Sequence, residues 1–134
     1  MEDGSTPAAF HNRCDNKGAT IVVAKVANSE QIVGGYNPFQ WALIDSSKST
    51  RDSFIYFFAD RKRIITAKVS YSNGDQYSIR NFSAHGLGFG GGCDLYYSSN
   101  GAWYASPYSY PKIDGMPIGQ FHVDDYEVYQ VIKK

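Results

Sequence analysis

The chain contains little cysteine and no long apolar segment. Only Cys14 and Cys93 occur among its 134 residues, too few for a framework of disulfides. No run approaches the roughly 18 apolar residues of a membrane span, so we expect no membrane insertion. The first ten residues, MEDGSTPAAF, are polar and acidic, unlike a secretory signal. Together these absences favour a cytoplasmic protein.

The chain also lacks an excess of charge of either sign. Thirteen Lys and Arg are balanced by thirteen Asp and Glu, so no global field favours nucleic acid or an anionic lipid surface. A neutral total does not exclude a local charged patch. Tyrosine is abundant instead, with eleven residues, and this side chain favours strands and half-buried surfaces.

One helix is predicted near the N-terminus, within residues 5–18. Thr6 can cap it, Pro7 suits its first position, and Gly18 lies just past its end. A second, single helical turn is expected within PFQWAL, residues 38–43. The chain therefore has one clear helix and one or two short ones.

Most of the remaining chain has the β-branched and aromatic content of strands. The segments with this pattern are 19–26, 32–37, 53–59, 64–71, 76–82, 94–98 and 126–132. The first two should form a hairpin, and Asn73-Gly74 predicts a second hairpin between the fourth and fifth. The segment 53–59 is apolar on both faces, which predicts a strand covered on both sides. Residues 45–51 and 99–119 are expected to be loops.

This pattern predicts the fold class. Short strands at regular spacing with few helices indicate a mainly β fold, an antiparallel two-sheet β-sandwich flanked by the helices. We expect a single domain over residues 1–134, excised from a larger protein, with residues 1–5 either disordered or a cloning remnant.

Glycine is concentrated in one stretch, HGLGFGGGCDLYY, residues 85–97. A phosphate-binding loop needs a lysine and a following helix. No lysine lies between Arg80 and Lys112, and the segment that follows is strand-like. We therefore expect these glycines to set backbone geometry, with Asp94 at the entrance of the next strand.

A redox or catalytic site would have to use Cys14 with His11, three residues apart on the predicted helix. A packed cysteine beside a capping histidine is the simpler interpretation. For metals, two clusters can be considered, His85 with Cys93 and Asp94, and His122 with Asp124 and Asp125. Neither has the paired spacing of a zinc site, so no metal and no cofactor are expected.

Two further features have alternative interpretations. Glu127 lies in DDYEVYQVI, a segment apolar on both faces, so we expect a buried carboxylate with a structural partner. The segment from Trp103 to Tyr110, with Tyr104 and Tyr108, could stack on sugars in a carbohydrate-binding sandwich. Rings that pack against their own sandwich are the simpler interpretation.

Six blocks of the sequence, taken in order, resemble the TLDc domain family of oxidation-resistance-type proteins. The blocks are FHNRCDNKGATIVVAKV, IVGGYNPFQW, DSFIYFF, YSIRN, FGGGCDLYY and DDYEVYQV. They extend over nearly the whole chain, from Asp3 to Val131. The chain departs from the family pattern at Ala19 and Leu87, where members often carry proline, and at Cys93, where histidine is common.

The resemblance implies a fold and a function. It implies a β-sandwich with short helices, a role in protection against oxidative damage, and binding to the peripheral sector of the V-type proton ATPase. It brings no catalytic residues, so we expect a non-enzymatic protein-binding module. The residues that carry the family pattern are Gly34, Gly35, Tyr36, Trp41, Asn81, Phe89, Gly90, Gly91, Asp94 and Glu127.

Overall fold

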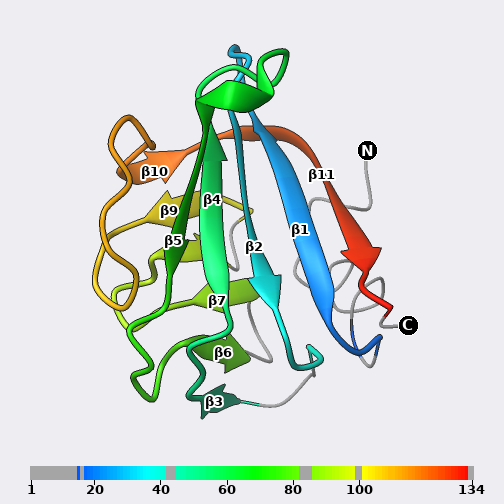
Figure 1. Ribbon diagram of the computed structural model, residues 1–134, viewed down its shortest axis with the longest axis vertical. Coiled ribbons are helices and arrows are strands. Elements are labelled where there is room, and N and C mark those ends of the chain that lie inside the picture. The colour runs from blue at the N-terminus through cyan, green and yellow to red at the C-terminus, as the bar shows by residue number, and fades with distance from the viewer. Residues whose placement is uncertain (1–14, 16, 42–44, 82–85, 99–100, 133–134) are drawn as a thin grey trace.

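The computed structural model describes residues 15, 17–41, 45–81, 86–98 and 101–132. Their strands form two antiparallel sheets (Figure 1). The five-stranded sheet has the order β11 (Val123–Gln130), β1 (Thr20–Val26), β2 (Ile32–Asn37), β4 (Phe54–Phe58) and β5 (Ala67–Tyr71). The six-stranded sheet has the order β10 (Gly119–Phe121), β9 (Trp103–Ala105), β8 (Leu95–Tyr97), β7 (Leu87–Phe89), β6 (Ile79–Asn81) and β3 (Ser46–Lys48).

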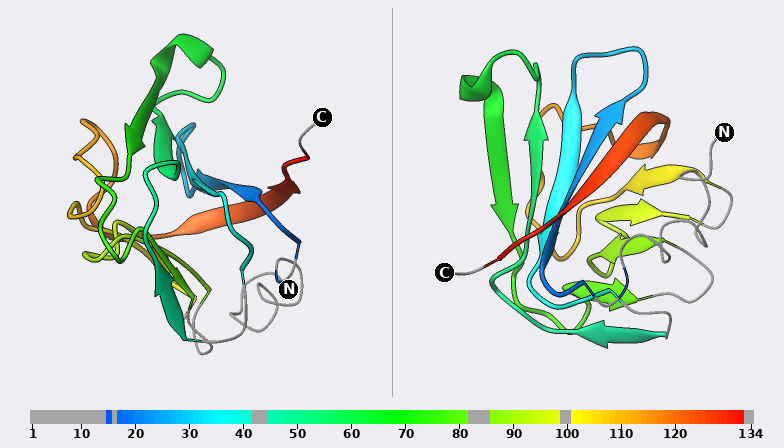
Figure 2. Two further views of the ribbon diagram at one scale, coloured as in Figure 1. Left: turned by 60° about the horizontal axis from the view of Figure 1, so that its bottom comes forward. Right: turned by 90° about the vertical axis from the view of Figure 1, so that its right-hand side faces the viewer.

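The hydrophobic core lies between the two sheets, which form separate layers in Figure 2. The five-stranded sheet contributes Val22, Val33 and Phe57, and the six-stranded sheet contributes Phe89 and Tyr97, each no more than 1% exposed. The mainly β class and the two antiparallel sheets predicted from the sequence are confirmed.

The first hairpin also forms as predicted. Strand β1 alternates buried and half-buried residues along its whole length, as expected of a strand with one face on the core. It pairs with β2 from Thr20 opposite Asn37 to Lys25 opposite Ile32. On its other side β1 pairs with β11, so β1 lies inside the sheet although it comes early in the chain.

Of the two helix predictions, one lies mostly outside the described residues and the other is wrong where it can be compared. The described residues contain no α-helix, and most of the helix expected within 5–18 lies outside them. The helical turn expected from residue 38 is wrong for residues 38–41. Trp41 instead forms a parallel bridge to Asp15 and is fully buried, with its indole N–H 3.1 Å from Thr20 Oγ1. Burial of this large side chain outweighs the local helical signal. No helix in the described ranges has the length and apolar character needed to cross a membrane.

The hairpin predicted at Asn73-Gly74 is also wrong. A turn does occur there, with Gly74 at φ +87° and the N–H of Asp75 bonded to Asn73 Oδ1 at 2.9 Å. The strand after the turn, β6, belongs to the other sheet and pairs with β3 and β7. The turn residues specify a local bend, but burial of Ile79 in the core decides which sheet the next strand joins.

Several boundaries differ from the expected ones. Residues 64–66 form a short 3-10 turn, η2 (Ile64–Thr66), instead of the start of a strand. Strands β3 and β9 lie in segments that were expected to be loops, and β10 begins at the last residue of such a segment, Gly119. Each of these strands has three residues, too few to show a two-residue period in the sequence.

Candidate binding surface

The glycine stretch turns the chain from β7 into β8. Gly90 has a left-handed φ of +90°, and the N–H of Cys93 donates to Gly90 O at 3.2 Å, which closes a tight turn. A Cβ on Gly90 would lie 2.0 Å from Asp94 Oδ1, so a side chain at this position would displace the carboxylate. This geometry agrees with the backbone role predicted for the glycines.

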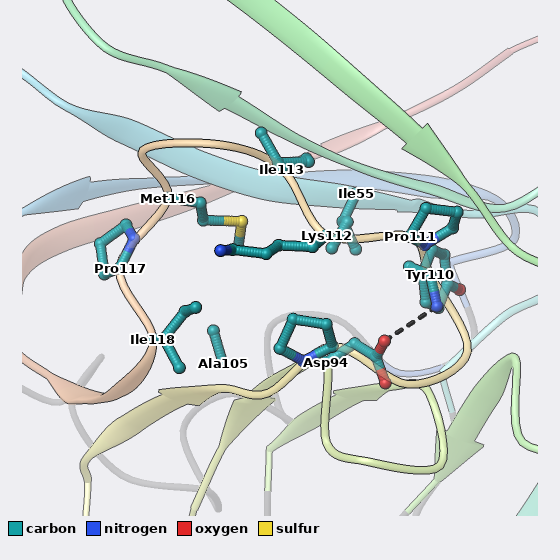
Figure 3. A pocket seen from close by; sticks show the side chains of 11 residues that line it. Ile55, Asp94, Ala105, Tyr110, Pro111, Lys112, Ile113, Met116, Pro117 and Ile118 are labelled. Carbon is teal, nitrogen blue, oxygen red and sulfur yellow. Dashed lines mark hydrogen bonds between the residues drawn. The ribbon is translucent and has the colours of Figure 1, made fainter.

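The carboxylate of Asp94 joins this turn to the loop that follows β9. Asp94 is 2% exposed. Its Oδ2 accepts the backbone N–H of Tyr108 at 2.6 Å and of Tyr110 at 2.8 Å, the second of which is drawn in Figure 3. Burial raises the pKa of the Asp94 carboxyl, and the N–H groups bonded to it oppose that rise. The Asp94 side chain therefore links the glycine turn to the loop after β9 through hydrogen bonds.

The backbone amides of the glycine turn are already bonded within the protein. Gly90 N–H donates to Tyr77 O at 3.0 Å, and Gly91 N–H donates to Ser109 Oγ at 2.8 Å. Gly92 N–H donates to Asp94 Oδ1 at 3.2 Å. A phosphate would have to break these bonds and approach a carboxylate, so the turn is not built to bind one.

The space beside Asp94 is too small for a ligand. It is closed by apolar side chains that include Ile55, Ile113 and Met116 (Figure 3) and has a volume of about 10 Å³. That volume is enough for one water molecule at most. The described residues beside Asp94 thus form no space of the size of a substrate.

Gly35, Trp41 and Phe89 of the family pattern pack the two sheets together. Trp41 and Phe89 meet edge to face with centroids 5.6 Å apart, and both are fully buried. A Cβ on Gly35 would lie 2.6 Å from the Phe89 ring, so the glycine lets the ring approach the sheet. Asn81, 3% exposed, donates through Nδ2 to Ser46 Oγ at 3.1 Å.

The prediction that Glu127 is buried is wrong. The residue is exposed on β11 and accepts a hydrogen bond from the hydroxyl of Tyr129, two residues along the same face. Tyr129 is itself 54% exposed, whereas Tyr126 on the opposite face is 5% exposed. Apolar residues on both faces of this segment do not indicate burial of both, because tyrosine tolerates an exposed position.

The redox candidates Cys14 and His11 lie outside the described residues. The other cysteine, Cys93, is a half-buried free thiol whose pKa is raised by burial. Burial therefore disfavours the thiolate of Cys93, which is the reactive form of a cysteine.

The metal candidates are not brought together by the described structure. His85 lies outside the described residues. Asp124 is paired with Lys25 at 2.6 Å. In the part of the chain that the structure describes, no three His, Cys, Asp or Glu side chains form a group that could hold an ion.

The aromatic segment proposed for sugar stacking contributes mainly to the core. Trp103 is 3% exposed and Tyr110 1% exposed. The Trp103 ring stacks on Tyr97 with centroids 4.9 Å apart. Only Tyr108, 70% exposed, presents its ring fully, so this segment is not a flat aromatic platform.

An apolar surface is found elsewhere, on the side of the five-stranded sheet that faces away from the core. No described element lies over these strands in Figure 1. The side chains surround an open hollow of about 490 Å³. We call this surface the outer face, and its residues are Ile21, Val23, Ile32, Phe54, Tyr56, Phe58, Arg61, Ala67 and Val69.

The outer face corrects the interpretation of residues 53–59 as a strand covered on both sides. The core side of β4 is closed by Ile55 and Phe57, while Phe54 and Phe58 on the other side remain half-buried. On the neighbouring strand Val69 and Tyr71 are 53% and 57% exposed. Sequence reasoning missed the surface, although the apolar residues at alternate positions of β1, β2, β4 and β5 could have indicated it.

Comparison with known proteins identifies the family. The TLDc domain model matches residues 1–132 of the chain. No curated protein matches it. The match covers both sheets and includes the glycine turn, Asp94 and the outer face. The protein belongs to the TLDc domain family.

Proposed function

We propose that this domain binds a protein partner through the outer face and does so without catalysis. The observation that carries the proposal is the exposed apolar surface of the five-stranded sheet. Asp94, a polar group that the sequence singled out, is occupied in holding the fold.

The composition of the outer face fits a protein interface. Protein interfaces are enriched in aromatic residues and arginine and depleted of lysine and carboxylates at their centre. The outer face has Phe54, Tyr56 and Phe58 along one strand and Arg61 at its end. Tyr36 extends it by stacking on Phe54 with centroids 5.4 Å apart. Apolar patches of this kind on a folded domain mark interaction sites.

The partner we propose is the peripheral sector of the V-type proton ATPase, in the cytoplasm, in keeping with the family to which the chain belongs. A role in protection against oxidative damage would then be exerted through the pump and not through a thiol of this domain. The outer face supplies a contact surface for such a partner.

Capture of the native pump by the immobilised domain tests this proposal. We expect the wild-type domain to retain pump subunits and the Val69→Asp variant to lose at least tenfold of that binding, because a charge is placed in the apolar surface. Ile132→Asp is the matched control, since Ile132 is 74% exposed and lies beyond the far end of β11.

The same experiment can contradict the proposal. Equal capture by Val69→Asp and Ile132→Asp would exclude the outer face as the binding surface. Failure of the wild-type domain to retain native pump from the same organism would exclude the proposed partner. Melting curves of both variants verify that any loss of capture is not a loss of folding.

A further inference from the structure

The hairpin that joins β4 to β5 ends in a turn with two exposed isoleucines. Ile64 and Ile65 are each 81% exposed, the highest exposure among the large hydrophobic residues described. The turn stands at the end of the five-stranded sheet, beside the turn between β1 and β2 (Figure 1). We call residues 60–68 the basic tip.

Hydrogen bonds hold the basic tip in a defined shape. The Thr66 hydroxyl donates to Arg63 O, at 2.7 Å, and it accepts the N–H of Asp60 at 3.2 Å. The Asp60 carboxylate accepts the N–H of Lys62 at 2.9 Å. These bonds close the turn below the isoleucines, so the two side chains project from a fixed base.

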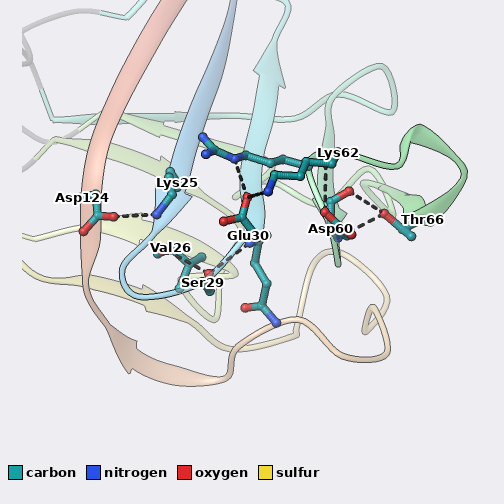
Figure 4. A network of polar contacts seen from close by, with 10 residues as sticks. Lys25, Val26, Ser29, Glu30, Asp60, Lys62, Thr66 and Asp124 are labelled. Atoms are coloured by element: carbon teal, nitrogen blue, oxygen red, sulfur yellow. Dashed lines mark hydrogen bonds and ion pairs between the residues drawn. The ribbon is translucent and has the colours of Figure 1, made fainter.

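Cations flank the isoleucines along the chain. Arg61, Lys62, Arg63 and Lys68 lie in the basic tip, against one carboxylate, Asp60. The carboxylate of Glu30, in the β1–β2 turn, neutralises part of this charge. Its Oε1 lies 2.7 Å from Arg61 Nε and 3.9 Å from Lys62 Nζ (Figure 4). The bond from Arg61 also lowers the pKa of Glu30. The basic tip with Glu30 keeps an excess of positive charge.

We propose that the basic tip docks on an anionic lipid bilayer. In this arrangement Ile64 and Ile65 enter the boundary between headgroups and acyl chains, and the neighbouring Lys and Arg side chains contact the anionic headgroups. This is peripheral binding, which needs no membrane-spanning segment. It goes beyond the proposed interaction of the outer face with a protein.

The shape of the basic tip favours a lipid surface over a protein. A stable protein interface buries on the order of 800 Å² on each partner, and it needs a broad complementary surface. Two adjacent aliphatic side chains on a projecting turn provide a small convex contact. Such a contact enters a fluid, planar interface easily, and long Lys and Arg side chains can reach the headgroups from the base of the turn.

Vesicle cosedimentation tests the proposal. We expect the domain to bind phosphatidylcholine vesicles that contain one quarter phosphatidylserine and not pure phosphatidylcholine, with binding weakened by added salt. The double variant Ile64→Ser, Ile65→Ser should lose at least tenfold of the affinity. Arg63→Glu should lose well over fivefold, since one basic residue near an anionic surface contributes about fivefold and its reversal adds repulsion.

Matched controls exist at the opposite end of the sheet. Ile132→Ser removes an isoleucine of similar exposure, 74%, and Lys17→Glu reverses an exposed charge that precedes β1. Both should bind phosphatidylserine vesicles as the wild type does. Because all substituted side chains are exposed, the variants should melt with the wild type.

Three outcomes would overturn the proposal. The first is no preference of the wild-type domain for phosphatidylserine vesicles. The second is equal vesicle binding by the wild type and the double isoleucine variant. The third is loss of pump capture by the tip variants while the wild type ignores vesicles, which would assign the basic tip to a protein partner.

Discussion

The hydroxyl of Tyr56 donates to the backbone O of Val22 at 2.7 Å. Tyr56 lies on β4 and Val22 on β1, so the side chain crosses the intervening strand β2. It crosses at Gly34, where a Cβ would lie 2.4 Å from the Tyr56 hydroxyl and 1.9 Å from Val22 O. The absence of a side chain at Gly34 therefore permits a hydrogen bond across three strands.

Gly34→Ala should destabilise the domain strongly. The added methyl group meets a backbone carbonyl that cannot move without disturbing the pairing of β1 and β2. We expect a loss of about 3 kcal/mol or more in the free energy of unfolding, in the upper range for overpacking. Urea denaturation measures it, with Tyr56→Phe as a companion that removes only the hydrogen bond and should cost about 1 kcal/mol. An unchanged midpoint for Gly34→Ala would contradict the packing described.

Two tyrosines should resist alkaline titration. Burial raises the pKa of both Tyr56 and Tyr110 far above the ordinary value of 10.0. Tyr56 bonds Val22 O, and Tyr110 donates to Ser78 O at 2.6 Å. Because their pKa is raised on folding, their stabilising contribution is complete below pH 10 and is lost as the pH rises beyond it.

The measurement is tyrosinate absorbance followed beside circular dichroism. Tyr56 and Tyr110 should stay protonated until the fold is lost at high pH. The double variant Tyr56→Phe, Tyr110→Phe should show a smaller fall of stability with pH. Complete ionisation of every tyrosine in a folded protein would refute this.

Gly90→Ala should cost more than Gly119→Ala. Both glycines have positive φ, +90° and +86°, so both variants bear the backbone strain, roughly 1–2 kcal/mol. Nothing lies within 4 Å of a Cβ on Gly119, whereas a Cβ on Gly90 collides with the Asp94 carboxylate. The difference between the losses in the free energy of unfolding of the two variants measures the cost of the collision with Asp94. Equal losses would show that Asp94 can move aside without cost.

The two carboxylates of the family pattern should differ in their effect on stability. Asp94→Ala removes the acceptor of several N–H groups at once and should cost about 3 kcal/mol or more. Glu127→Ala removes an exposed side chain and should change stability by no more than about 0.5 kcal/mol. Thermal melts of the two variants provide the comparison. A large loss for Glu127→Ala would contradict the minor role given to its exposed side chain.

The fold class and the role of the glycine turn could be predicted from the sequence because each has a local cause. The alternation in β1 follows from one buried face, and the missing lysine and helix already argued against a phosphate loop. Asp94 could be singled out by position, but its bonds to Tyr108 and Tyr110 join residues 14 and 16 positions away. No local pattern indicates such a contact.

The wrong predictions concern features that tertiary contacts determine. Asn73-Gly74 specifies a turn but not the sheet that the next strand enters. An apolar face looks the same in the sequence whether a layer of the same chain or a partner covers it. This ambiguity led to the expectation that residues 53–59 are covered on both sides and that Glu127 is buried.

The pairing of β1 with β11 has a consequence for how the chain acquires its structure. Thr20 lies opposite Gln130, so an interior strand of the sheet gains its second neighbour only when the last strand is available. Contacts of such long sequence separation slow folding, because a large loop must close first. During synthesis, β1 therefore lacks its second partner strand until nearly the whole chain has been made. Throughout that time its unpaired edge can pair with other chains and cause aggregation.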